Sequence, residues 1–220
     1  MRMVIRAHFV PVSERWNVDP KGGRRVPNPL LRRLGPEAMD GWLRAAYSES
    51  RALQESKGGD ATFYEVGANA PELLDWYIKG FYGSVFYGGR VDVRTKELLR
   101  YRLSMTHGCA YCNKGNIEAA RRAGLADEQL DAVMDEDSDA FTGRERAVLR
   151  LAAEMALTNM DGRLEPALYE DLSAHFDDAE IFELGMVAAV LTGMAKFLFV
   201  YDLVEREAHC PIGPRTGADA

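Results

Sequence analysis

Cysteine is scarce in this sequence of 220 residues, which contains only Cys109, Cys112 and Cys210. Three cysteines are too few for the disulfide framework of a small secreted domain, and an odd number cannot pair completely within one chain. This count fits a reducing compartment. We therefore expect a cytoplasmic protein.

Long apolar runs are also rare. The longest extends from Leu184 to Tyr201, is interrupted by Lys196 and is bounded by Glu183 and Asp202. A membrane-spanning helix needs about 20 predominantly apolar residues, so this run predicts a helix that packs against protein. The N-terminal residues carry scattered arginines without the apolar core of a signal peptide. We expect no membrane partner and no targeting segment.

Positive charge is in deficit, because 27 Lys and Arg residues face 34 Asp and Glu residues, a net charge of −7. Residues 1–34 hold eight basic and two acidic side chains, so the rest of the chain carries −13. An acidic body repels a phosphate backbone, and we expect no nucleic-acid partner. The basic arm could contact an acidic surface. The nearest candidate for that surface is another copy of the same chain.

Alternating strand patterns are absent outside the N-terminal arm, whereas apolar residues at helical spacing recur along the chain. Prolines and glycines predict an extended arm over residues 1–34, followed by a helical domain over 35–208 and a flexible tail over 209–220. The fold class is therefore predicted to be all-α. The expected helices cover about residues 36–56, 71–87, 94–106, 109–123, 127–134, 142–157, 166–175 and 179–207.

Cys109 and Cys112 form a Cys-x-x-Cys pair at the predicted start of a helix. Free backbone N–H groups and the helix dipole lower a thiol pKa there, and the two-residue spacing allows a reversible disulfide. Such a dithiol can attack a peroxide through one sulfur and release water by closing onto the other. His107 and Gly108 just upstream add a proton carrier and a hinge.

Two other interpretations of the cysteine pair stay open. A zinc site needs about four ligands, and His107, His209 and Cys210 could complete one, although their spacing matches no common pattern. The two cysteines could instead be buried and inert. We expect neither a metal nor an organic cofactor.

Glu97 lies on the preceding predicted helix, with Tyr101 and Ser104 on the same face. If the two helices form a hairpin, this face approaches Cys112, where Glu97 could relay a proton and Tyr101 could contact a substrate. The alternative is a solvated surface glutamate beside basic neighbours.

The predicted helix at residues 71–87 is strongly aromatic. Such side chains usually form a core or a subunit interface, but here they could also form an apolar wall for a bulky substrate, with Trp76 and Phe81 in contact with it. The aromatic residues are Trp76, Tyr77, Phe81, Tyr82, Phe86 and Tyr87.

The stretch from Gly88 to Cys112 resembles the AhpD-like alkylhydroperoxidase / carboxymuconolactone decarboxylase family. That family places a glutamate twelve residues before the first cysteine of Gly-Cys-x-x-Cys, and Glu97 and Cys109 match this interval. The resemblance covers about residues 60–205. It implies an all-helical fold that assembles as trimers or hexamers, with the active site between packed helices.

The resemblance also implies roles for individual residues. In the family's peroxidases the second cysteine attacks the peroxide and the first resolves the product, which assigns these steps to Cys112 and Cys109. Glu97 takes the place of the relay glutamate. The expected partners are a hydroperoxide or small organic substrate and a thiol reductant.

One position departs from the family pattern, which has a histidine four residues after the second cysteine where this chain has Asn116. Asparagine can orient a water or a substrate but carries no proton near neutral pH. His107 or Tyr111 would then have to supply the proton. The departure keeps open a cofactor-free lyase or isomerase acting on a small carboxylated or lactone substrate through Glu97, Tyr111 and Asn116, and also a catalytically silent oligomer.

Overall fold

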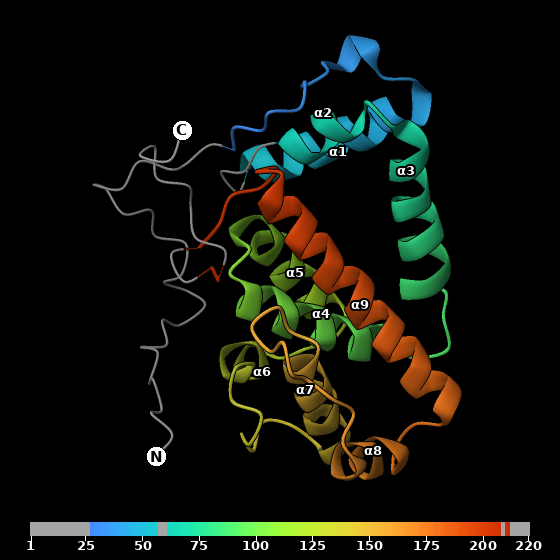
Figure 1. Ribbon diagram of the computed structural model, residues 1–220, viewed down its shortest axis with the longest axis vertical. Helices are drawn as coiled ribbons and strands as arrows, with labels where there is room; N and C mark the ends of the chain where they lie inside the picture. The colour runs from blue at the N-terminus through green and yellow to red at the C-terminus, as the bar shows by residue number, and fades with distance from the viewer. Residues whose placement is uncertain (1–26, 57–60, 208–209, 212–220) are drawn as a thin grey trace, which may run out of the picture.

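The computed structural model describes residues 27–56, 61–207 and 210–211, and these residues form helices and no strand (Figure 1). The predicted all-α class is confirmed. Most of the arm predicted over residues 1–34 and most of the tail predicted over 209–220 lie outside the described residues.

The helices follow the predicted order, with one short addition before Pro71. They are η1 (Pro36–Ala38), α1 (Gly41–Ser56), α2 (Thr62–Gly67), α3 (Pro71–Asp75), η2 (Trp76–Phe86), α4 (Val93–His107), α5 (Ala110–Arg122), α6 (Asp127–Ala132), α7 (Gly143–Glu154), α8 (Pro166–Ser173) and α9 (Asp178–Val200).

Helix α4 is the centre of the molecule and packs against α5, α7 and α9. Asp92 caps its first turn by accepting a hydrogen bond from the Thr95 N–H. Helix α9 runs obliquely across the bundle from α8 to the pair formed by α1 and α2 (Figure 1). Because α4 is covered on several sides, even its charged residues Lys96, Glu97 and Arg100 are buried.

The segment predicted as a single α-helix over residues 71–87 divides into α3 and the π-helix η2. In a π-helix the hydrogen bonds run between residues five apart, as from the Tyr87 N–H to the Tyr82 carbonyl at 2.9 Å. Residues at this spacing would point about 140° apart in an α-helix. In η2 they follow one another along a shared side, which changes the face that each aromatic residue presents.

A buried ion pair joins α4 to α9 and holds the loop between η2 and α4. The Lys96 ammonium is fully buried and lies 3.0 Å from the Glu183 carboxylate, which also accepts the backbone N–H groups of Arg90 and Val91 at 2.7 and 3.2 Å. Charge and hydrogen-bonding capacity are therefore satisfied together, as a buried pair requires.

The last helix ends at Val200, so the prediction that it extends to Glu207 was wrong. Asp202 adopts a left-handed conformation with φ 55°, and the Leu203 N–H bonds back to the Leu198 carbonyl at 2.9 Å. Such a turn reverses the chain and closes the helix.

Helix α9 is long and apolar enough, by length and composition alone, to cross a membrane, a property that core helices of soluble proteins share. One of its faces packs in the core through Leu184, Val187 and Ala188. The other face leaves Phe182 and Met186 exposed.

Candidate active site around the Cys109–Cys112 disulfide

A tight turn joins α4 to α5 and presents the cysteines. Gly108 ends α4 in the left-handed conformation, with φ 65°, and an added Cβ would lie 2.8 Å from the Cys210 Cα. Glycine avoids both the steric penalty and the collision. The segment after α9 folds back here, because the Glu207 N–H bonds to the Gly108 carbonyl at 2.8 Å.

Replacement of Gly108 by alanine is expected to lower the free energy of unfolding by on the order of 1–3 kcal/mol. Urea denaturation of Gly108→Ala and wild type measures this loss. Gly193→Ala, inside helix α9, is the matched control. A Cβ at this position would meet nothing within 4 Å, so the substitution should leave stability unchanged or raise it. Equal stability of the two variants would contradict the proposed need for glycine at the turn.

Cys109 and Cys112 form a disulfide at the start of α5. Cys109 is the N-cap residue and is fully buried, whereas Cys112 is half-buried. The Cys112 N–H donates to the Cys109 Sγ at 3.2 Å. When the disulfide is reduced, this donor and the helix dipole favour a thiolate on Cys109.

Both cysteines line a cavity of about 510 Å³ formed by residues of α2, η2, α4, α5 and α9. Its walls are mostly aromatic and aliphatic, and among the described residues no carboxylate lines it. Five tyrosines contribute to the walls, and three of them follow the five-residue spacing of the π-helix. The tyrosines are Tyr64, Tyr77, Tyr82, Tyr87 and Tyr111.

Glu97 is buried behind the cavity wall and is not a solvated surface residue, since only 1% of it is exposed. Its carboxylate pairs with the Arg100 guanidinium, and Arg100 itself lines the cavity. Burial raises the pKa of the Glu97 carboxyl, and the charge of Arg100 opposes this rise. Arg100 thus stands between the predicted relay glutamate and the cavity.

His107 lines the same cavity, but its ring also serves the backbone. The Leu157 N–H donates to the His107 Nε2 at 3.1 Å. Burial lowers the pKa of His107 to about 4. The ring is therefore neutral near pH 7, with an unprotonated Nε2.

Tyr111 and Asn116 both line the cavity from α5 and are half-buried. Asn116 lies one helical turn after Cys112 on the same face. The structure thus brings Cys109, Cys112, His107 and these two residues to one cavity. Glu97 does not line the cavity but pairs with Arg100, which does.

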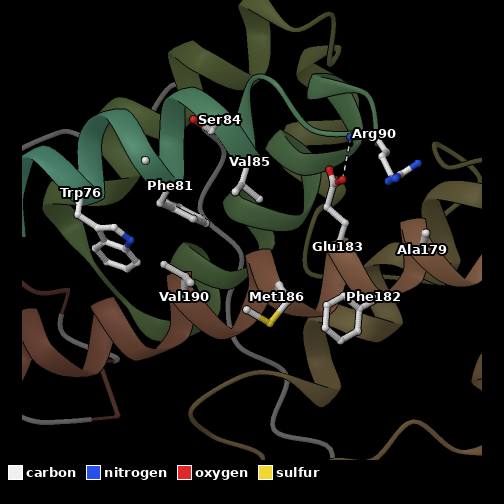
Figure 2. A pocket seen from close by; sticks show the side chains of 11 residues that line it. Trp76, Phe81, Ser84, Val85, Arg90, Ala179, Phe182, Glu183, Met186 and Val190 are labelled. Atoms are coloured by element: carbon white, nitrogen blue, oxygen red, sulfur yellow. Dashed lines mark hydrogen bonds between the residues drawn. The ribbon is translucent and has the colours of Figure 1, made fainter.

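The three residues predicted to bind substrate do not line this cavity. Tyr101 is buried in a separate cluster with Leu98 and Ile117. Trp76 and Phe81 line a second cavity of about 610 Å³ between η2 and α9 (Figure 2). Trp76 and Phe81 lie on that side of the π-helix, whereas the residues that follow them, Tyr77 and Tyr82, line the cavity at the disulfide.

No cluster of three or more His, Cys, Asp or Glu side chains in the described part of the chain is arranged to hold a metal ion. His209, which the zinc alternative needs, lies outside the described residues.

Solved structures with the same helical arrangement cover most of this chain. An uncharacterized peroxidase-related protein from Silicibacter sp. TM1040 superposes with a TM-score of 0.62 and 18% identity, covering 86% of this chain and 98% of that one. The alkylhydroperoxidase AhpD core protein from Ralstonia eutropha JMP134 gives 0.60 and 17%, over 84% and 96%. A variant of the debrominase Bmp8 in complex with 2,3,4-tribromopyrrole gives 0.61 and 16%, over 84% and 95%. At these identities the likeness establishes the fold.

The sequence model of the carboxymuconolactone decarboxylase family matches residues 71–154, which include Glu97 and both cysteines of the disulfide. This match covers less than half of the chain and supports the resemblance of this segment to the AhpD-like family. The family match therefore contains η2, α4 and α5, the elements that form most of the cavity.

Two curated relatives match parts of this chain. The uncharacterized protein YdfG of Bacillus subtilis (strain 168) is 26% identical over 98 residues, which is 44% of this chain and 66% of that protein. Uncharacterized protein 4 in the cox locus of Paracoccus denitrificans is 37% identical over 46 residues, 21% of this chain and 41% of that protein. The matched region spans less than two thirds of either relative.

Two cavity residues, Arg100 and Arg122, were missed from the sequence, whereas Tyr77 and Tyr82 were among the aromatic residues named for a possible substrate wall. The tyrosines carried a usable signal, since Tyr77, Tyr82 and Tyr87 are spaced by five. The arginines carried none, because surface helices commonly contain such residues.

Proposed function

We propose that this protein is a thiol-dependent peroxidase that reduces organic hydroperoxides through Cys112 and Cys109. The observation that supports this proposal best is the disulfide itself, whose two cysteines lie at a helix start and line a largely aromatic and aliphatic cavity. An inert structural disulfide would not need a cavity of ligand size beside it.

In the proposed reaction the Cys112 thiolate attacks the outer oxygen of the hydroperoxide. A sulfur–oxygen bond forms, the oxygen–oxygen bond breaks, and the leaving alkoxide takes a proton to become an alcohol. The Cys109 thiolate then attacks the Cys112 sulfenic sulfur, the sulfur–sulfur bond forms as the sulfur–oxygen bond breaks, and the displaced hydroxide takes a proton to leave as water. The dithiol has lost two electrons, and the hydroperoxide has gained them.

A thiol reductant would restore the dithiol by attacking the Cys112 Sγ. Cys112 is the more exposed cysteine, and attack there releases Cys109 as a thiolate. The Cys112 N–H, 3.2 Å from the Cys109 Sγ, stabilises that leaving group. The same thiolate is the one that the resolving step requires.

The proton for the alkoxide has few sources in this cavity. His107 is neutral near pH 7, and its Nε2 accepts a backbone N–H. Tyr111, or a water held by Asn116, is therefore the proposed donor, and Glu97, which pairs with Arg100, is the proposed relay behind it. The direct test is consumption of cumene hydroperoxide with dithiothreitol as the reductant.

The lyase or isomerase is the second candidate function, and the specific observation that favours it is Asn116 in place of the family histidine. A carboxyl whose pKa is raised by burial, as in Glu97, is also a suitable general acid or base. The fold can accept a small ring, as the debrominase with tribromopyrrole illustrates.

We propose in addition that copies of this chain assemble through the groove between η2 and α9. Its walls include Trp76, Phe182 and Met186, of which Phe182 is 71% exposed (Figure 2). An apolar surface of this kind is typical of an interface. Phe182→Glu combined with Met186→Glu is expected to convert the trimer or hexamer to monomers in light scattering.

The control for assembly is Met160→Glu, which adds a charge at an exposed methionine outside the groove. It should leave the assembly unchanged. A wild-type monomer, or a double variant that still assembles, would exclude the groove as an interface.

A further inference from the structure

The cavity around the disulfide has a marked charge asymmetry. Two arginines, Arg100 and Arg122, line it together with aromatic and aliphatic side chains, and no acidic residue does so among the described residues. Glu97 neutralises Arg100 from behind the wall. Arg122 forms no ion pair within the described part of the chain, so these three charged groups sum to a net positive site.

Arg100 is an unusual residue for a cavity wall because it is 8% exposed and its Nε is buried without a hydrogen-bond partner. Buried polar groups are nearly always hydrogen-bonded, and an unsatisfied N–H costs free energy. The rest of the guanidinium is well held: it pairs with Glu97 and lies 4.8 Å from the Phe86 ring centre and 5.7 Å from that of Tyr82. The guanidinium is therefore a fixed positive charge on the wall of the cavity.

Arg122 provides a second cation from the last turn of α5. Its side chain is exposed and lines the same cavity, and its charge acts on Glu97 by lowering the pKa of that carboxyl. Arg100 and Arg122 therefore both contribute positive charge to this cavity. Arg100 would hold the anion inside the cavity, and Arg122 would attract it from the mouth.

We infer that the cavity binds an apolar organic acid, with its carboxylate at Arg100 and Arg122 and its apolar body against the tyrosines. A guanidinium matches a carboxylate in shape and charge, and the cavity of about 510 Å³ is of a size that holds a small organic ligand. Where this inference concerns the reaction it rests on the proposed function, because the substrate would then be a hydroperoxide that carries a carboxylate.

The binding test uses a matched pair of probes, 3-phenylpropanoate and the neutral 3-phenylpropanol, titrated calorimetrically against the whole protein. The acid is expected to bind at least about tenfold more tightly than the alcohol, because hydrogen bonds to charged groups are the stronger ones. Higher salt should weaken binding of the acid and leave binding of the alcohol unchanged. Equal affinities would overturn the inference.

Two variants locate the anion. Arg122→Gln should weaken binding of the acid about three- to tenfold without changing that of the alcohol. Arg121→Gln removes the same charge one residue earlier, from a side chain that pairs with Glu118 and Asp127 outside the cavity, and it should change neither. An equal effect of both substitutions would show general attraction and would overturn the inference.

Arg100 is tested with its partner, as Glu97→Gln combined with Arg100→Met, so that no buried charge is left alone. This variant should show a smaller preference for the acid over the alcohol than wild type, because only Arg122 remains to attract the carboxylate. Retention of the full wild-type preference would overturn the role of Arg100.

Because these measurements need no turnover, they separate the two proposals. Selective binding of the acid without peroxide consumption would remove the proposed function and leave the anion site. Peroxide consumption without any preference for the acid would remove the anion site and leave the proposed function.

Discussion

Replacement of Cys112 by serine is expected to reduce dithiol-dependent consumption of cumene hydroperoxide by a factor on the order of 10³ or more. The serine hydroxyl is not ionised near neutral pH and is a weak nucleophile toward peroxide oxygen. Cys112 is the half-buried sulfur of the pair, and it lines the cavity in which the hydroperoxide would lie. Among the described residues that line this cavity, only the fully buried Cys109 offers another thiol.

Cys109→Ser should fail in a different way. Its Cys112 would still react once with peroxide, but no resolving sulfur would follow, so one equivalent of a trappable sulfenic acid should form and turnover should stop. Cys210→Ala is the matched control, because Cys210 is a buried cysteine outside the disulfide. That variant should keep turning over. Full activity in Cys112→Ser would rule out the thiol peroxidase.

The same set of variants separates the peroxidase from the lyase or isomerase. With a lactone or carboxylated substrate, a lyase should lose more activity in Glu97→Gln than in Cys112→Ser, because the carboxyl would carry the proton. A peroxidase should show the opposite order.

The sequence was sufficient to predict the parts of the site that local chemistry determines. Gly108 ends one helix, Cys109 begins the next, and both positions follow from capping preferences that act within a few residues. The placement of Cys112 and Asn116 on one face of α5 follows from helical spacing alone. The all-α class follows in the same way from repeated local patterns.

The rest depends on contacts between segments that are distant in the chain. Trp76 and Phe81 were assigned to the substrate wall on the assumption of an α-helix, whereas the π-helix places them beside α9. The segment after Val200 turns back to bond with Gly108, a contact across about half of the chain. Arg100 is buried because α4 is covered by several helices. No short window of sequence contains these facts.

The buried state of His107 predicts a strong acid sensitivity of the fold. The pKa of its ring is lowered from 6.5 to about 4 in the folded protein, so protonation of the unfolded chain begins first as the pH falls. The stability that the neutral His107 ring contributes is fully present above pH 6.5, the pKa of histidine in the unfolded chain. It is lost as the pH falls from 6.5 to about 4. The loss reaches roughly 3 kcal/mol, since one pKa unit corresponds to about 1.4 kcal/mol.

Urea denaturation at several pH values measures this loss, and a non-titrating side chain isolates it. His107→Gln keeps an oxygen that can accept the Leu157 N–H, so it should show a much smaller fall in stability over the same pH range. His175→Gln removes an exposed histidine and should retain the wild-type dependence. Parallel curves for wild type and His107→Gln would mean that the ring takes up a proton as readily in the folded protein as in the unfolded chain. It could then donate a proton from the cavity wall, which would restore the relay role that the family histidine would otherwise have at position 116.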